Sequence, residues 1–258
     1  MNIYNTFDSV PLIENAVLAL GTFDGMHLAH RHLVERVCQN AGAVKGNSVV
    51  VSFLSHPQKT IAENYNHGVL TTQSEKTDIF AEIGLNNLII MDFTTEISNM
   101  SYTNFVQFLR TKIDIRKIVL GYNHHFGKNR EGCYATLQTL GKELHFEVES
   151  IEKQTIDGLD ISSSSIRQAL RQGDIETANK ILGYNYSICV RVLYDKNGQN
   201  YTIFFDPDKL LPKNGRYIIN GNGKNLWATV KQPSFTIEEM NEEEGSFRME
   251  FISREKSE

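Results

Sequence analysis

The chain has 258 residues, of which 40% are hydrophobic and 22% are charged, a composition typical of globular proteins that disfavours long disordered stretches. Its formal net charge of -5 argues against a general binder of nucleic acids or anionic membranes. No apolar run approaches the roughly 20 residues that cross a bilayer, and the first residues, MNIYNTFDSV, show no secretory signal. Three dispersed cysteines argue against a disulfide framework or a zinc knuckle, so we expect a cytoplasmic protein.

Short apolar runs alternate with helix-like stretches over the first 185 residues. The runs lack polar alternation, which is typical of strands covered on both faces. A repeated strand–helix–strand pattern predicts an α/β fold with a parallel sheet and right-handed crossovers. The expected strands are 17–20, 48–53, 87–93, 117–121 and 146–151, and the expected helices are 27–41, 73–83, 102–112 and 134–142.

Two short helices are expected next, at 162–170 and 174–182, separated by Gly173 as a C-cap and Asp174 as an N-cap. After Tyr186 the pattern changes to short strands punctuated by Asn and Gly turns. Such spacing predicts a small, mostly antiparallel β domain or partial barrel. We therefore expect one domain at 1–185 and a second at 186–258.

The segment GTFDGMHLAH, residues 21–30, lies between an expected strand and an expected helix. Glycines in such a turn let backbone N–H groups approach phosphate oxygens, and the following helix directs its positive end to the same place. His27 and His30 are neighbours in the first helical turn and can donate hydrogen bonds to phosphoryl oxygens. An ordinary strand-to-helix turn is the alternative. A metal-binding histidine pair is a further alternative, but no third ligand stands at a suggestive spacing.

Three further segments carry polar residues at expected element ends. In ISSSSIRQAL, residues 161–170, serines precede a helix and Arg167 can reach the same anion, although this segment by itself favours a solvated, serine-capped surface helix. In LGYNHHFGKNREG, residues 120–132, the candidates follow a strand, where open α/β sheets bind ligands, but a plain surface loop is possible. His56 and Pro57 follow another strand, where a simple turn is the alternative.

Together these segments resemble, in the same order, the motifs of the adenylyltransferase module of bacterial bifunctional riboflavin kinase/FAD synthetases. GTFDGMHLAH is similar to GxFDGxHxGH, ISSSSIR to ISSTxIR, and GYNHHFGKNREG to GxDFxFGxxRxG. With Leu182–Tyr186, which resembles the LGRPY that ends this module, the likeness covers about the first 70% of the chain. The resemblance implies a Rossmann-like nucleotidyltransferase domain that transfers the adenylyl group of ATP to FMN, giving FAD and pyrophosphate with Mg²⁺.

The resemblance also implies roles for individual residues. The implied catalytic residues are His27, His30, Ser164 and Arg167. ATP contacts are implied for Gly21, Thr22, Phe23, Asp24, Gly25 and Ser163, and flavin contacts for His56, Pro57, Asn123 and Phe126. No resident metal ligand is expected. We expect the histidine pair and the serine–arginine cluster to converge around one triphosphate.

This sequence departs from the family motifs at Ala29, which replaces a glycine, at Ser164, which replaces a threonine, and at His124, which replaces an aromatic residue. Asp160 stands where many relatives have a basic residue. Residues 186–258 resemble a shortened riboflavin-kinase barrel without its GFPTAN-like segment, so we expect no riboflavin kinase activity. A flavin- or nucleotide-binding protein without catalysis, or a nucleotidyltransferase with another acceptor, remains the alternative.

Overall fold

The computed structural model describes residues 1–54, 68–195, 201–238 and 244–255. The chain forms two compact units, Met1–Asn66 with Gln73–Gln154 and His67–Thr72 with Thr155–Glu258. This division does not coincide with the expected boundary at 185/186, because α7 (Ser163–Gln172) and α8 (Ile175–Leu182) share an apolar core with the strands that follow them. The boundary between functional modules stays a prediction.

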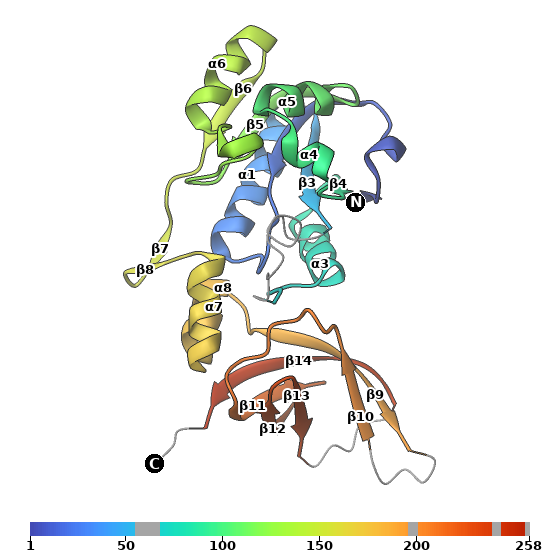
Figure 1. Ribbon diagram of the computed structural model, residues 1–258, viewed down its shortest axis with the longest axis vertical. Helices are drawn as coiled ribbons and strands as arrows, with labels where there is room; N and C mark the ends of the chain where they lie inside the picture. The colour runs from blue at the N-terminus through green and yellow to red at the C-terminus, as the bar shows by residue number, and fades with distance from the viewer. Residues whose placement is uncertain (55–67, 196–200, 239–243, 256–258) are drawn as a thin grey trace. The chain divides into compact units, whose positions relative to one another are not determined.

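The first unit contains a six-stranded sheet in which every neighbouring pair of strands is parallel. The strands lie in the order β1-β4-β3-β2-β5-β6. Figure 1 labels β3, β4, β5 and β6 of this sheet. Their bounds are β1 (Asn2–Tyr4), β2 (Ile13–Leu20), β3 (Asn47–Phe53), β4 (Asn87–Met91), β5 (Ile113–Leu120) and β6 (Glu147–Ser150). The prediction of a parallel α/β sheet is confirmed. Only β1 was not expected, because a three-residue polar edge strand has no apolar pattern.

Helices connect these strands, and the four that the sequence predicts are present with ends within two residues of the expected ones. The helices are α1 (Leu28–Ala43), α3 (Gln73–Ile83), α4 (Thr95–Asn99), α5 (Tyr102–Arg110) and α6 (Tyr134–Leu144), with 3-10 turns η1 (Phe7–Ser9) and η2 (Lys128–Arg130). Within the parts of the chain that the structure describes, every helix is too short or too polar to cross a membrane.

The strand order places a topological switch point beside β2. From β2 the chain passes to β3 and β4 on one side and then returns to β5 on the other side. The connections that leave the carboxyl ends of β2 and β5 therefore diverge, and ligands of open α/β sheets bind in the crevice that this divergence creates. The segments 21–27 and 121–127 both start at this point of the sheet.

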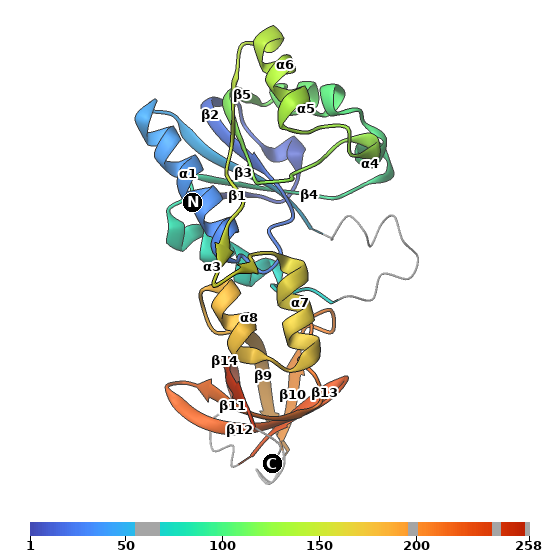
Figure 2. The same cartoon turned by 90° about the vertical axis from the view of Figure 1, so that its left-hand side faces the viewer.

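The second unit contains an antiparallel six-stranded sheet in the order β10-β9-β14-β11-β12-β13, with α7 and α8 side by side against it (Figure 2). Buried and exposed residues alternate along its strands, as in β13, because one face covers the core. The bounds are β9 (Ser187–Tyr194), β10 (Tyr201–Phe205), β11 (Gly215–Gly221), β12 (Lys224–Lys231), β13 (Ser234–Ile237) and β14 (Gly245–Arg254), with a separate hairpin of β7 (Thr155–Ile156) and β8 (Leu159–Asp160). The prediction of a small antiparallel β region is confirmed.

The caps of α7 and α8 form as the sequence predicts. Gly173 ends α7 in the left-handed conformation with φ 81°. The Asp174 side chain then accepts a hydrogen bond of 3.0 Å from the backbone N–H of Thr177 and begins α8.

Residues 68–72 belong to the second unit although they precede α3 of the first. Val69 pairs with Lys209 in a parallel bridge, and Leu70 is buried in the apolar core of the second unit. The buried ammonium of Lys209 donates a hydrogen bond of 2.7 Å to the carbonyl of Leu70. The chain thus leaves the first unit and re-enters it within a few residues.

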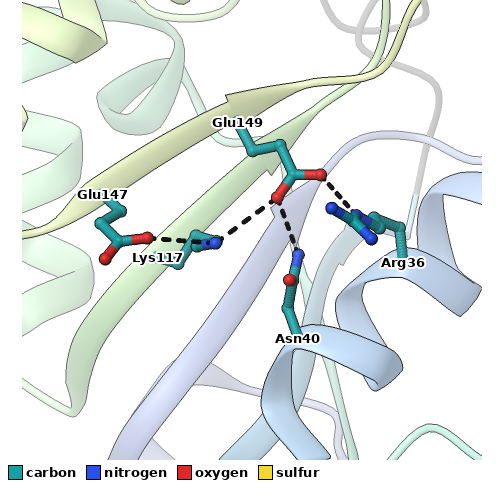
Figure 3. Close-up of polar contacts among 5 residues, drawn as sticks. All are labelled: Arg36, Asn40, Lys117, Glu147 and Glu149. Carbon is teal, nitrogen blue, oxygen red and sulfur yellow. Dashed lines mark hydrogen bonds and ion pairs between the residues drawn. The ribbon is translucent and has the colours of Figure 1, made fainter. Parts of the chain in front are cut away.

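A polar cluster joins α1 to β5 and β6 (Figure 3). Glu149 accepts hydrogen bonds from Arg36 and, at 2.9 Å, from Asn40, while Lys117 lies between Glu149 at 3.5 Å and Glu147 at 3.1 Å. Burial opposes the ionisation of Glu149, but the hydrogen bonds from Arg36 and Asn40 and the charges of Arg36 and Lys117 outweigh it and lower the pKa of this carboxyl. The cluster stabilises the contact between helix and sheet.

Candidate active site at the carboxyl ends of β2 and β5

The turn after β2 has a strained backbone. Its residues Phe23, Gly25 and Met26 have φ angles of 50°, 88° and 36°. Positive φ values at residues other than glycine persist only where the surrounding structure holds them. The Phe23 ring supplies part of that support, since it is 1% exposed and makes an edge contact with Phe80 of α3 at 5.5 Å. The Phe23 side chain is therefore part of the core and not a ligand contact.

The two histidines of the first motif lie face to face. His27 is the N-cap of α1, and its Nδ1 accepts a hydrogen bond of 3.3 Å from the backbone N–H of His30. The two rings stack with centroids 3.7 Å apart. Because Nδ1 accepts this bond, the proton of a neutral His27 ring resides on Nε2, which leaves that atom as a hydrogen-bond donor.

Both rings are neutral in the free protein at pH 7. Burial lowers the pKa of His27 from 6.5 to about 4, although the charge of Asp24 opposes this effect. Burial also lowers the pKa of His30 well below 6.5, and the charges of His27, His124 and Lys76 lower it further. An anionic ligand would reverse much of this effect, because a negative charge favours the protonated imidazole.

The loop after β5 contributes a third histidine. The turn at Gly121–His124 closes with a backbone hydrogen bond of 3.1 Å, and the ring of His124 lies 6.0 Å from that of Phe126. Burial, together with the charges of His125 and Arg130, lowers the pKa of His124 to about 4. The charged form of His124, after β5, opposes protonation of His30, after β2, as expected for loops that follow neighbouring parallel strands.

Close packing holds the rest of this loop. Phe126 and Gly132 form a bridge, and Phe126 is half-buried against Phe105 with ring centroids 5.9 Å apart. A Cβ at Gly132 would lie 2.8 Å from the Phe126 carbonyl and 2.8 Å from the Tyr102 Cβ, so no larger residue fits without a shift. Asn123 is exposed with φ 57°, a conformation that asparagine tolerates.

Some buried polar side-chain atoms near the carboxyl ends of β2 and β5 have no hydrogen-bond partner among the described residues. Among the residues that the structure describes, Nδ1 of His30 and Nε2 of His124 have no hydrogen-bond partner, and neither does the side-chain amide of Gln73 at the start of α3. Buried polar atoms are almost always paired, so unpaired ones indicate an absent ligand or water. Imidazole nitrogens and a side-chain amide can each donate a hydrogen bond to an anion.

Sequence reasoning missed Lys76. This residue of α3 is 6% exposed, and its ammonium donates a hydrogen bond of 3.3 Å to the carbonyl of Thr22 in the turn. Lys76 is separated from the turn by more than 50 residues, and its helix has no motif that ties it to the histidines. No spacing rule could have found it.

The serine–arginine cluster begins α7 in the second unit. Ser162, rather than Ser163 or Ser164, is the N-cap, since its hydroxyl accepts a hydrogen bond of 3.1 Å from the backbone N–H of Ser165. Ser164 is exposed. Arg167 is 9% exposed as a residue, and its guanidinium donates to the carbonyls of Ser163 and Gly68, at 3.4 Å and 3.3 Å.

The remaining expected site residues have mixed outcomes. His56 and Pro57 lie outside the residues that the structure describes. Ala29 is half-buried in the first turn of α1, and Asp160 is exposed at the end of β8. The two anion-suited clusters belong to different compact units, so their convergence stays a prediction.

Known proteins resemble this chain in sequence. The FAD synthetase family matches residues 10–165. A bifunctional riboflavin kinase/FMN adenylyltransferase of Listeria monocytogenes is 33% identical over 213 residues, which are 80% of this chain and 67% of that protein. The protein of the same name from Escherichia coli K12 is 31% identical over 183 residues, 70% of this chain and 58% of the relative. The matches thus cover about three fifths to two thirds of the relatives' length.

A solved structure resembles the whole chain in fold. The crystal structure of a macrolide-efflux protein from Streptococcus pneumoniae has a TM-score of 0.85, with 99% of this chain and 91% of that chain covered. At 18% identity, this likeness concerns the fold alone. The family match spans more than half of the sequence and contains the histidine pair and the β5 loop, in agreement with the motifs. The chain therefore belongs to the FAD synthetase family.

Proposed function

We propose that this protein transfers the adenylyl group of ATP to FMN, giving FAD and pyrophosphate. One observation carries the proposal most directly: the stacked His27 and His30 lie at the switch point of a parallel sheet, where Nδ1 of His30 and Nε2 of His124 are buried without a hydrogen-bond partner among the described residues. Family membership supplies the reaction class and the two substrates.

In the proposed reaction, a phosphate oxygen of FMN attacks the α-phosphorus of ATP. The bond from that phosphorus to the bridging oxygen of pyrophosphate breaks, and pyrophosphate leaves. No covalent intermediate with the protein is required, because positioning and charge stabilisation supply most of the acceleration in such transfers. His27 would donate from Nε2, and His30 would donate to a second oxygen as negative charge develops.

Other residues have proposed binding roles. The backbone from Gly21 to Gly25 would hold ATP phosphates, and the start of α7, with Ser163, Ser164 and Arg167, would hold the leaving pyrophosphate. Flavin contacts are proposed for Asn123 and Phe126, and for His56 and Pro57. Mg²⁺ would enter as part of the MgATP substrate, bound mainly by phosphate oxygens.

Riboflavin kinase activity is not part of the proposal. A Thr-Ala-Asn triplet, as in the GFPTAN-like segment, occurs in this sequence at Thr177–Asn179. It lies within α8, before the region that resembles the kinase barrel. The Asn179 side chain accepts a hydrogen bond of 2.7 Å from the backbone N–H of Tyr186 and donates one of 2.8 Å to the carbonyl of Phe251. These bonds give Asn179 a structural role. Formation of FMN from riboflavin and ATP by the purified protein would contradict this part of the proposal.

The deciding experiment incubates the purified protein with FMN, ATP and Mg²⁺ and follows FAD by chromatography and pyrophosphate by a coupled assay. We expect both products in equal amounts. Tight binding of FMN or ATP without pyrophosphate release would instead identify a non-catalytic binding protein. Pyrophosphate release with a phosphopantetheine or a mononucleotide, but not with FMN, would identify another acceptor. The proposal places the reaction in the cytoplasm, where the three free thiols persist.

A further inference from the structure

Helix α3 supports the strained turn at two points. The Phe80 ring packs edge-on against Phe23, and the Lys76 ammonium donates to the Thr22 carbonyl. The two supported residues are adjacent, and the backbone after Thr22 enters the unusual conformation at Phe23. Because an exposed chain would relax such a turn, the contacts from α3 contribute to its shape.

The burial of Lys76 costs free energy that a purely structural residue would avoid. Its side chain is almost fully buried, and burying an ammonium is unfavourable unless it is paired or hydrogen-bonded. Burial lowers the pKa of Lys76, while the charge of Asp24 opposes this change and favours the ammonium form. A leucine or methionine would fill the same space without this cost, so the charge itself calls for a reason.

The surroundings of His30 suggest that reason. The positive charge of Lys76 acts on His30 from α3, His27 acts from the α1 N-terminus, and His124 acts from the β5 loop. Asp24, in the turn, acts on both His27 and Lys76. Lys76 is the lysine of this group, and the charge of Asp24 favours its ammonium form, while His30 retains a ring nitrogen without a partner among the described residues.

We propose that Lys76 is a positioning residue for the histidine pair, fixing the Thr22 carbonyl of the turn and placing an ammonium group beside His30. This inference rests on the proposed adenylyl transfer for its consequence, but its structural content does not depend on it. Burial is the main reason why the pKa of His30 is low, and the Lys76 ammonium lowers it further, until the negative charge of a substrate opposes both effects. Lys76 also adds attraction for the incoming polyphosphate.

The test compares Lys76→Met, which removes both the charge and the hydrogen bond, with Lys76→Gln, which keeps a donor toward Thr22 but no charge. Lys76→Arg keeps the charge, and Lys142→Met makes the same chemical change at an exposed lysine of α6. The first readout is the titration of the His30 imidazole by NMR in the free protein, assigned by its loss in His30→Gln. We expect the pKa of His30 to rise in Lys76→Met and Lys76→Gln and to stay low in Lys76→Arg and Lys142→Met.

The second readout is the rate of FAD formation. We expect kcat to fall by about tenfold in Lys76→Met, to recover in large part in Lys76→Arg, and to be unchanged in Lys142→Met. An unchanged His30 titration in both uncharged variants would overturn the inference. If Lys76→Met does not fold, the His30 titration is measured in Lys76→Gln, which also lacks the charge. If the wild-type protein formed no FAD, the proposed function would fail while the titration would still decide the role of Lys76.

Discussion

Two polar clusters of the first unit differ in how completely their atoms are paired. In the cluster around Glu149, the carboxylate meets Arg36, Asn40 and Lys117, and the contacts lie at the edge of the sheet (Figure 3). At the switch point, His30 and His124 retain buried nitrogens without partners among the described residues, and the backbone beside them is strained. Each cluster joins residues that are far apart in the sequence.

We interpret the fully paired Glu149 cluster as contributing to stability and the incompletely paired histidine cluster as contributing to function. A buried group that meets all its partners lowers the free energy of the folded state, whereas one without partners costs free energy until a ligand arrives. Ligand sites are held in this unfavourable state by the rest of the fold. The two clusters should therefore respond oppositely to substitution and lose their contributions in different ranges of pH.

The largest expected effect is the acid response of the histidine cluster. In the unfolded chain His27 binds a proton below pH ~6.5, but in the folded protein only below about 4. The free energy of unfolding should therefore fall as the pH falls through this interval, by up to about 3 kcal/mol from His27. Urea denaturation at several pH values measures it. In His27→Asn, which retains an N-cap, the slope should be shallower, and an equal slope in both proteins would contradict the assignment.

The second prediction concerns catalysis at the same cluster. His30→Ala should lower the rate of FAD formation at least about tenfold, equivalent to about 1.4 kcal/mol, because one donor to the reacting phosphates is lost. The free energy of unfolding should change little, since the ring has an unpaired buried nitrogen. His32→Ala, an exposed change on the same helix, is the control. A loss smaller than tenfold would show that His30 has no such role.

The Glu149 cluster should behave in the opposite way. Glu149→Gln should lower the free energy of unfolding by about 1 kcal/mol at pH 7, because charge-assisted hydrogen bonds to Arg36 and Lys117 become neutral ones. FAD formation should be unchanged. Glu147→Gln, whose side chain is 65% exposed, should have a smaller effect on stability.

Acid should also distinguish the Glu149 cluster from the histidines. Because the folded protein lowers the pKa of Glu149, its stabilising contribution is present above the unfolded value near ~4.3 and is lost as the pH falls below it. The stabilities of wild type and Glu149→Gln should therefore differ at pH 7 and converge as the pH falls through the lowered pKa of Glu149. A constant difference over this range would contradict the pairing.

The smallest expected effect tests the second unit. Ser164→Ala removes an exposed hydroxyl in the first turn of α7, so the free energy of unfolding should stay the same. If Ser164 binds ATP phosphates, the KM for ATP should rise about threefold, equivalent to about 0.7 kcal/mol. Ser246→Ala, at an exposed serine of β14, is the control. Equal KM values in wild type, Ser164→Ala and Ser246→Ala would show that Ser164 does not bind ATP.

Much of the fold could be predicted because its signals are local. Apolar runs mark β2 to β6, and Gly173 and Asp174 mark the junction of α7 and α8. The short polar strand β1 was missed, because its pairing with the distant β4 decides its conformation, and β7 was missed because a two-residue strand in a hairpin has no apolar pattern. The extent of the second unit was also missed, since its core includes Leu70, far away in the sequence.

The candidate site also has a part that local sequence predicts and a part that it does not. The turn 21–27 and the histidine pair are contiguous, so sequence spacing alone places their rings on one face of the first helical turn. The approach of Lys76 to Thr22, and of His124 to His30, joins segments separated by more than 50 residues in the first case and more than 90 in the second. Periodicity and spacing describe only neighbours along the chain.

The sequence by itself thus determined the alternation of strands and helices, the glycine turn and the helix caps, because each depends on backbone preferences within a few residues. Tertiary structure alone decided which side chains surround His30 and whether their polar atoms find partners. Strand order brings the ends of β2 and β5 together, and burial there changes both the hydrogen bonding and the protonation of the histidines. Such properties depend on distance in space, which no local pattern encodes.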